Sequence, residues 1–200
     1  MIKEIIDLFK ISLFNIPFKV DNETDFENEL KKIRKKSQNV HRSNAGGLQF
    51  EISINDEFFK NFIKNLEEEA NNLKSFYNIK NKLKISNFWL NINGHKDFNK
   101  EHIHPGGVLS GVFYFKVPDN SGFIKFKHPN MNLIDWYNCD LDLANINPIS
   151  NNSEYILKPK KNMLLIFPSW INHSVDLNLN TEERISIAFN LCKHTNEKRI

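Results

Sequence analysis

The sequence has little cysteine, no long apolar run and almost no excess charge of either sign. Its two cysteines, Cys139 and Cys192, lie far apart and outside any CxxC pattern, which favours a reducing compartment, although they could still form one bridge. No apolar run approaches the ~20 residues of a membrane span. The acidic residues within residues 1–14 interrupt the continuous apolar core that a signal peptide requires. We therefore expect a cytoplasmic protein without a membrane segment.

The net charge is only +3, from 27 basic and 24 acidic residues. This balance is too mild to indicate a nucleic-acid partner. A local basic run does interleave with apolar residues at helical spacing, which is typical of a solvated helix face. The run comprises Lys31, Lys32, Arg34, Lys35 and Lys36.

The length suits a single domain spanning 1–200, and no linker rich in Pro, Gly or Ser divides it. The N-terminal part, 1–80, reads as a strand or short hairpin followed by helices. Residues 25–36 and 56–73 carry apolar side chains at a spacing of three and four, which predicts two amphipathic helices. The Gly pair at 46–47 marks a turn between them.

From residue 81 to residue 195 the pattern changes to short strands separated by turn residues. Alternation is clearest over 122–128, where Ile124 and Phe126 share one face. The polar stretch 129–153 is long enough to be an excursion near a functional mouth. These patterns predict a mainly β (α+β) fold of sandwich or barrel type, with the N-terminal helices packed outside. Other strands are predicted at 83–93, 108–117, 154–159, 162–168, 174–179 and 184–191.

Among seven histidines, His102 and His104 stand out as an HxH pair. In a strand, residues two apart point to the same face, so both imidazoles can reach one metal ion at about 2.0–2.2 Å. Such a pair also arises by chance, but it gains weight from His173, which follows a β run ended by Pro168. The remaining histidines show no partner spacing and are expected at the surface: His41, His95, His128 and His194.

Arg184 lies in an alternating strand in which Ser186 shares its face. A buried arginine is costly without an anion, and a guanidinium beside a hydroxyl suits a carboxylate. The alternative interpretation pairs Arg184 with Asp176 or Glu183. Glu183 is an awkward partner because adjacent strand residues face opposite ways.

Together these residues resemble the 2-oxoglutarate- and Fe(II)-dependent oxygenases, in particular a bacterial and phage subgroup. The resemblance covers about residues 85–191 and follows the order of that superfamily: a His-containing pair, a distal His and then an Arg. The motifs that carry it are WLNIN at 89–93, HIHP at 102–105, SGVFY at 110–114, FPSW at 167–170, His173, and RISIAFN at 184–190.

The resemblance implies a double-stranded β-helix, a jelly roll of cupin-like type, with catalytic Fe(II) held by His102, His104 and His173. It implies that Arg184 and Ser186 bind the distal carboxylate of 2-oxoglutarate. Reaction with O₂ would then give a ferryl-oxo species that abstracts hydrogen from a substrate C–H bond, with release of succinate and CO₂. Further candidates to line the cofactor cavity are Asn91, Asn93, Ser110 and Tyr114.

One departure is that most of the superfamily has a carboxylate where His104 stands. Three neutral imidazoles leave such a site one negative charge short, so His104 could be a ligand or could orient substrate or water. Asp97 or Glu101 could place a carboxylate beside a ligand imidazole. The alternative function is a cupin-like dioxygenase or isomerase whose three-His site does not use 2-oxoglutarate. A metal-free jelly roll is a third interpretation.

The expected substrate is a small molecule or a protein side chain, and the weak charge argues against nucleic acid. Gln49 could approach the mouth of the cavity. Trp89 and Trp170 read as core or rim aromatics. The N-terminal third could cover that mouth or form a homodimer contact.

Overall fold

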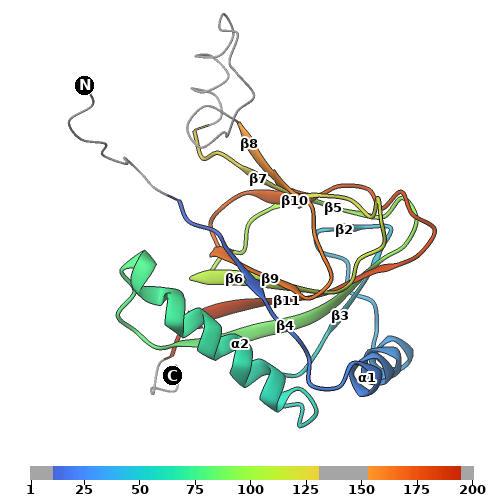
Figure 1. The fold of residues 1–200 in the computed structure, drawn as a ribbon, viewed down its shortest axis with the longest axis horizontal. Coiled ribbons are helices and arrows are strands. Elements are labelled where there is room, and N and C mark those ends of the chain that lie inside the picture. Colours follow the sequence, from blue (N-terminus) through green and yellow to red (C-terminus); the bar gives the residue numbers. More distant parts are fainter. Residues whose placement is uncertain (1–10, 131–152, 195–200) are drawn as a thin grey trace, which may run out of the picture.

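The computed structural model describes residues 11–130 and 153–194, which form two facing antiparallel sheets (Figure 1). The major sheet has six strands. In sheet order they are β1 (Phe14–Pro17), β9 (Met163–Pro168), β6 (Leu109–Lys116), β11 (Arg184–Lys193), β4 (Leu83–Asn93) and β3 (Leu48–Glu51).

The minor sheet has five shorter strands. Consecutive strands alternate between the sheets from β4 to β7 and again from β8 to β11, so the chain winds around a common axis. This winding confirms the predicted mainly β, jelly-roll-like architecture. In sheet order the strands are β2 (Asn44–Ala45), β5 (Phe98–His102), β10 (His173–Val175), β7 (Ile124–Lys127) and β8 (Glu154–Leu157).

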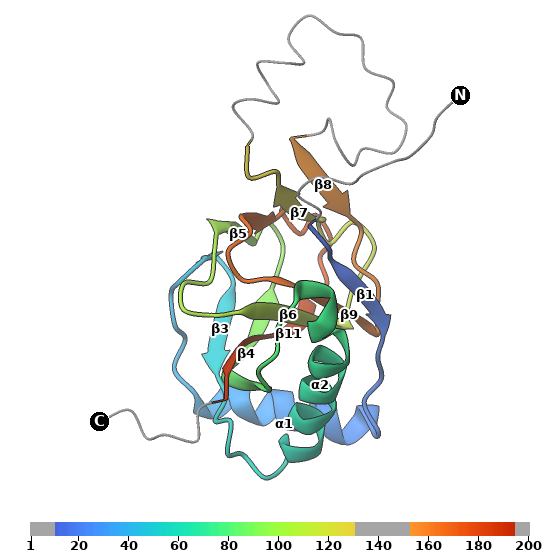
Figure 2. The ribbon, with the colours of Figure 1, turned by 90° about the vertical axis from the view of Figure 1, so that its left-hand side faces the viewer.

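Two helices, α1 (Glu23–Lys36) and α2 (Lys60–Leu73), lie against the major sheet on the side away from the minor sheet (Figures 1 and 2). A short 3₁₀ helix, η1 (Lys74–Tyr77), follows α2. The packing follows the prediction that the helices lie outside the β core. Among the described residues, no helix has the length and apolar character needed to cross a membrane.

The helices begin at different residues from those predicted. α1 begins at Glu23 because the side chain of Asn22 accepts hydrogen bonds from the backbone N–H groups of Thr24 and Asp25, at 3.1 and 3.2 Å. α2 begins at Lys60, since the chain from Asp56 first makes a turn. In this turn the Asp56 carboxylate accepts from Phe58 N at 2.9 Å.

The strands also differ from the prediction in places. The region around the Gly46–Gly47 turn contributes β2 and β3, which join β1 as the strands of the described part of the N-terminal third. The strand predicted at 174–179 is only His173–Val175. β5 ends at His102, so the expectation that His102 and His104 share one strand is wrong. Residues 5–10 of the predicted segment 5–18 and residues 131–152 of the predicted segment 129–153 lie outside the described residues, as does Cys139.

The principal core lies between the helices and the major sheet. Phe26 of α1 and Phe62 of α2 meet there with a ring-centroid distance of 5.0 Å, and both contact the fully buried Phe113 of β6. Each buried phenylalanine contributes roughly 1.5–3 kcal/mol. A second core lies between the sheets and includes Val112, Phe126 and Leu165 among other residues. The rest of the space between the sheets is a cavity that is lined in part by polar side chains.

Alternation along β11 divides its side chains between the two layers. Ile187 and Phe189 enter the helix-side core, whereas Arg184, Ser186 and Ala188 line the cavity between the sheets.

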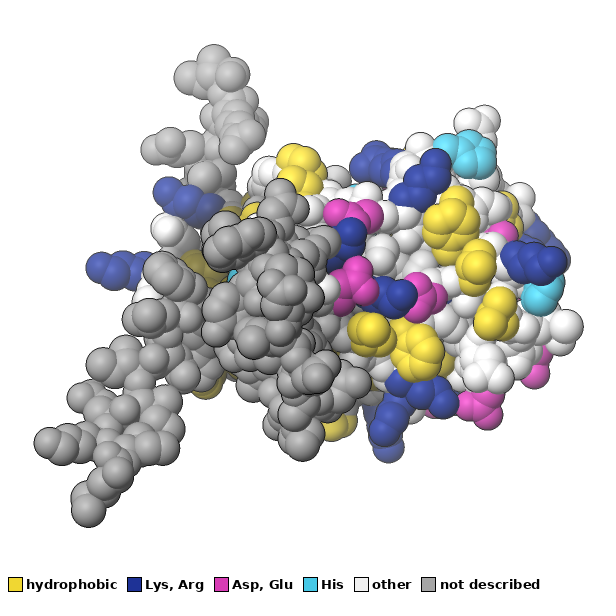
Figure 3. Space-filling model, turned by 90° about the horizontal axis from the view of Figure 1, so that it is seen from above, with side chains coloured by type: hydrophobic (Ala, Val, Ile, Leu, Met, Phe, Trp, Pro, Cys, Tyr) yellow, Lys and Arg dark blue, Asp and Glu magenta, His cyan; other side chains and the backbone are white. Residues whose placement is uncertain are grey.

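On the described part of the face in Figure 3, basic and acidic side chains are interspersed. Ion pairs join Lys125 to Asp176 and Lys127 to Glu101.

Candidate functional site

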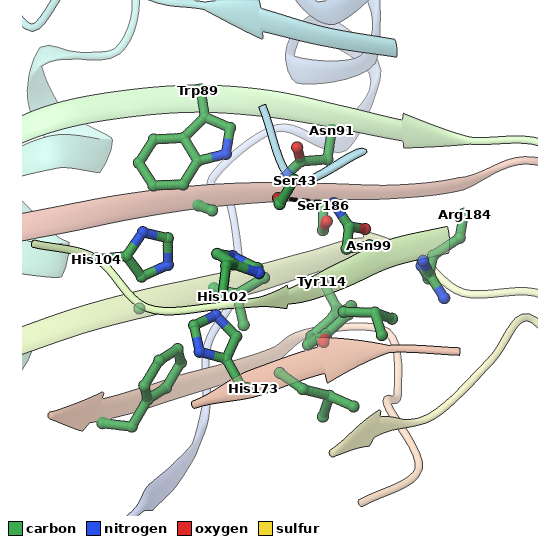
Figure 4. Close-up of a pocket in the computed structure, with 16 residues that line it drawn as sticks. Ser43, Trp89, Asn91, Asn99, His102, His104, Tyr114, His173, Arg184 and Ser186 are labelled. Carbon is green, nitrogen blue, oxygen red and sulfur yellow. Dashed lines mark hydrogen bonds between the residues drawn. The ribbon is translucent and has the colours of Figure 1, made fainter. Parts of the chain in front are cut away.

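Three imidazoles converge at one end of the cavity between the sheets (Figure 4). His102 on β5 and His173 on β10 have ring centroids 4.3 Å apart, and His104 lies 5.0 Å from each. One ligand nitrogen per residue can be chosen so that all three lie within 4.8 Å of one another. Metal–nitrogen bonds of about 2.0–2.2 Å would draw these nitrogens closer together than this limit, so binding a metal ion contracts the triad.

Two of the rings are held in a defined orientation by backbone carbonyls. His102 Nδ1 lies 2.7 Å from the carbonyl oxygen of Lys100, and His173 Nδ1 lies 3.0 Å from that of Ile171. Because a carbonyl only accepts, each Nδ1 carries the proton, which leaves Nε2 with a free lone pair. This is the arrangement of a metal-ligating histidine, whose second nitrogen is fixed by a hydrogen bond.

Burial keeps the triad uncharged at neutral pH. Desolvation lowers the pKa of His173 to about 3 and that of His104 to about 4, and it also lowers the pKa of His102. A smaller effect in the same direction comes from the neighbouring imidazoles for His173 and His104. Neutral imidazoles are the form that binds metal ions, so the site needs no deprotonation at neutral pH.

His104 joins the triad from the loop that follows β5. Its backbone N–H donates to the carbonyl oxygen of Ser169 at 2.9 Å, and its ring lies 5.6 Å from that of Trp89, centroid to centroid. Trp89 thus lines the cavity, whereas Trp170 is exposed at the surface. Although His104 is not in a strand, the structure brings it together with His102 and His173.

The opposite end of the cavity holds a buried cation. Arg184 is only 1% exposed, and its Nη1 donates to the carbonyl oxygen of Ser121. Its Nη2 is buried and has no hydrogen-bond partner among the described residues. Burial lowers the pKa of Arg184, while nearby Tyr114 and Asp176 act in the opposite direction. An anion in the cavity would satisfy this guanidinium.

Neither Asp176 nor Glu183, the two alternative partners that the sequence offered, pairs with Arg184. The Asp176 carboxylate lies 2.9 Å from Lys125 Nζ, and that of Glu183 lies 2.8 Å from Arg34 Nη1. The guanidinium therefore lines the cavity without an ion-pair partner in the described part of the chain.

Polar side chains line the wall between the triad and Arg184 (Figure 4). Ser186 of β11 is the cross-strand partner of Asn91 on β4 and of Tyr114 on β6, so the three form one row. Asn91 Oδ1 is buried without a hydrogen-bond partner among the described residues. Burial raises the pKa of Tyr114 to about 12, which keeps its phenol protonated as a donor.

Several candidates lie outside this arrangement. Neither Ser110 nor Asn93 lines the cavity. The Ser110 hydroxyl bonds to Ser169 and Asn190, and the Asn93 amide donates to Asn99 Oδ1 at 3.4 Å. Asp97 accepts from Gly94 N at 2.7 Å and Glu101 pairs with Lys127, so neither places a carboxylate in the histidine cluster of the described residues. The four remaining histidines are also outside the cluster, and of these only His128 is partly buried: His41, His95, His128 and His194.

The structure adds wall residues that the sequence did not single out. Asn99 of β5 lines the cavity and donates to the Ser43 hydroxyl at 3.3 Å. In a regular strand Asn99 and His102 would point to opposite faces, because they are three residues apart. The pairing of β5 with β10 is irregular, and no sequence signal marks this irregularity. Gln49 lies on β3 and is the cross-strand partner of Asn91 on β4. It is buried and does not lie at the mouth of the cavity.

Comparisons with known proteins agree with this geometry. The family model described as "Putative 2OG-Fe(II) oxygenase" matches residues 87–190. A prolyl-4-hydroxylase structure from Pseudomonas putida aligns with a TM-score of 0.65 at 11% identity, over 92% of this chain and 94% of that one. A comparison with curated proteins finds no match.

Two further solved structures have the same fold. The alpha-ketoglutarate-dependent epimerase SnoN from nogalamycin biosynthesis aligns with a TM-score of 0.62 at 14% identity, over 92% of this chain and 80% of that one. HygX from Streptomyces hygroscopicus, with nickel and 2-oxoglutarate bound, gives 0.59 at 9% identity, over 92% and 83%. At such identities the likeness concerns the fold, and it confirms the double-stranded β-helix.

Proposed function

This chain belongs to the 2OG-Fe(II) oxygenase family, and from that premise we propose that it oxidises a substrate C–H bond, using Fe(II), 2-oxoglutarate and O₂ and releasing succinate and CO₂. One observation carries the proposal. A single cavity has three converging imidazoles at one end and, at the other, a buried guanidinium with an unpaired nitrogen.

The donor set of the triad fits iron. His102, His104 and His173 offer three neutral nitrogens, and imidazole is a ligand that suits Fe(II) as well as Zn, Cu and Ni. Two of the rings already have Nδ1 bonded to a carbonyl, which leaves their Nε2 lone pairs for a metal ion. We therefore assign all three as metal ligands, with His104 in the place that a carboxylate usually takes in this family.

The other end of the cavity fits a dicarboxylate. Arg184 would place Nη2 on the distal carboxylate, which supplies the counter-ion that the described protein does not. Ser186 and the protonated Tyr114 would add donors from neighbouring strands, and Asn91 would form the wall beside them. Bound together, the metal and 2-oxoglutarate would supply the activation of O₂, while these side chains orient the co-substrate.

The buried Arg184 also bears on the alternative function. A three-His dioxygenase or isomerase that does not use 2-oxoglutarate would leave this buried cation without an anion to bind Nη2, which is costly. Hydroxylation is the outcome that we propose for a small-molecule or protein side-chain substrate. Structures with this fold include a prolyl-4-hydroxylase, an epimerase and a carbocyclase, so product analysis must identify the outcome for this chain.

The direct test is an anaerobic titration of the metal-free protein, first with Fe(II) and then with 2-oxoglutarate. A weak visible band from metal-to-ketoacid charge transfer should appear, and His173→Ala should abolish it. His95→Ala is the matched control, since His95 is an exposed histidine outside the cluster. If the unaltered protein gives no band, and no succinate once O₂ is admitted, the proposal is wrong.

A further inference from the structure

His104 is anchored differently from the other two histidines of the triad. The structure shows no hydrogen bond to its ring from any described residue, whereas His102 and His173 each bond to a carbonyl through Nδ1. His104 also lies beyond the end of β5, so no strand fixes its backbone. Some other part of the structure must therefore hold this ring beside its partners.

The backbone of the 104–108 loop is tied to the turn that follows β9. His104 N donates to the carbonyl oxygen of Ser169 at 2.9 Å, and Ser169 N donates to that of Val108 at 3.2 Å. Within the loop, Gly107 N donates to the carbonyl oxygen of His104 at 3.2 Å. Ser169 thus bonds to the loop on both sides of the glycine, and its position determines that of His104.

The side chain of Ser169 is in turn fixed to the major sheet. Ser169 is fully buried, and its hydroxyl lies 2.8 Å from that of Ser110 on β6. Ser110 donates onward to Asn190 Oδ1 on β11 at 2.8 Å, so Ser169 is the donor in the bond between the two serines. This chain of bonds connects the His104 loop to two central strands.

Gly107 allows the loop to close on Ser169. A Cβ at position 107 would lie 2.5 Å from Ser169 Oγ and 3.0 Å from Ser169 Cβ, and the backbone there does not require glycine for its φ angle. The neighbouring Gly106 is the opposite case, since its φ is +85° and nothing lies within 4 Å of a Cβ there. Gly107 is therefore needed for close approach and Gly106 for backbone conformation.

We propose that Gly107, Ser169 and Ser110 form a clasp that positions His104 as the third metal ligand. These are positioning residues, and the inference rests on the proposed function in that the triad binds a metal ion. The clasp fixes the backbone of His104, as β5 does for His102 and β10 for His173.

Co(II) binding tests the clasp without any need for turnover. We expect Ser169→Ala and Gly107→Ala each to weaken Co(II) binding by about 10–100-fold, the usual effect of removing a group that orients a ligand. The visible d–d spectrum should change as it does in His104→Ala. Gly106→Asn is the control and should lose much less affinity than Gly107→Ala, because asparagine tolerates a positive φ better than most side chains and nothing lies near a Cβ at position 106.

A double variant separates the clasp from a general loss of stability. In the background of Ser169→Gly, which removes the atoms that a Cβ at 107 would meet, Gly107→Ala should cost much less Co(II) affinity than in the unaltered protein. Thermal unfolding of each metal-free variant is measured in parallel. A purely structural role would lower the unfolding midpoint and leave the affinity and spectrum of the folded protein unchanged.

Two failures are distinguishable. If the unaltered protein gives no Co(II) spectrum, the proposed metal site is wrong and the clasp with it. If the unaltered protein binds Co(II) but Ser169→Ala and Gly107→Ala keep its affinity and spectrum, or Gly106→Asn loses as much, the clasp alone is overturned.

Discussion

His102 and His173 are direct cross-strand partners on β5 and β10, with their ring centroids 4.3 Å apart. Side chains of such partners project from the same face of a sheet, so the pairing of these two short strands creates two adjacent ligands from distant parts of the chain. The pair faces the major sheet, and His104 completes it from the following loop. The candidate metal centre therefore depends on strand register in the minor sheet.

The depressed pKa of His173 predicts a pH-dependent stability of the metal-free protein. Burial lowers this pKa from 6.5 to about 3, so the unfolded chain binds a proton more readily than the folded one between these values. Stability is therefore full above about pH 6.5 and falls as the pH drops, by up to about 1.4 kcal/mol per pH unit. Urea unfolding at about pH 7 and about pH 5 measures this. His173→Leu should reduce the slope, and an unchanged slope would contradict the assignment.

Arg184→Met should separate co-substrate binding from stability. Loss of charge-assisted hydrogen bonds should weaken 2-oxoglutarate binding by about 3 kcal/mol, roughly 100-fold, in a titration of the charge-transfer band. The free energy of unfolding of the protein without ligands should stay the same or rise, because a buried cation without a counter-ion is removed. Arg34→Met, at an exposed arginine paired with Glu183, is the control. Equal 2-oxoglutarate affinities in the two variants would refute the role of Arg184.

Tyr114→Phe should have a smaller effect on the same affinity. Removing one neutral donor costs about 0.5–1.5 kcal/mol, which is roughly a 2–10-fold weaker binding of 2-oxoglutarate. Because burial raises the pKa of Tyr114 to about 12, its contribution should stay constant from about pH 7 to about pH 10. Tyr155→Phe, at an exposed tyrosine on β8, should change nothing. A Tyr114 contribution that is about half lost by about pH 10 would show that the phenol ionises with its ordinary pKa.

Phe26→Ala tests the helix-to-sheet core. Phe26 is 4% exposed and contacts aromatic rings of α2 and of the major sheet, so its truncation should cost about 3–5 kcal/mol of the free energy of unfolding. The control Phe76→Ala removes a ring that is 68% exposed and should cost far less. Both are measured by urea denaturation. Similar losses in the two variants would mean that α1 does not depend on this core.

The parts of the fold with strong periodicity were predictable from sequence. Alternation over 184–191 correctly placed Ser186 on the face of Arg184, and the three-and-four spacing identified both helices. Helix starts were less predictable because capping depends on single side chains such as Asn22. The HxH spacing correctly indicated two neighbouring rings, but for the wrong reason, since His104 reaches the triad from a loop.

By itself the sequence determined the residue types of the candidate site, because the presence of imidazoles, a guanidinium and an alternating strand pattern are local properties. Only the tertiary structure decided which groups meet: that Asp176 and Glu183 pair elsewhere, that Ser110 turns to Ser169, and that Asn99 reaches the cavity wall. The physical reason is that these contacts join residues far apart in the chain. Strand register and close packing fix such contacts. The sequence periods of strands and helices, which are two residues and three to four residues, do not encode either of them.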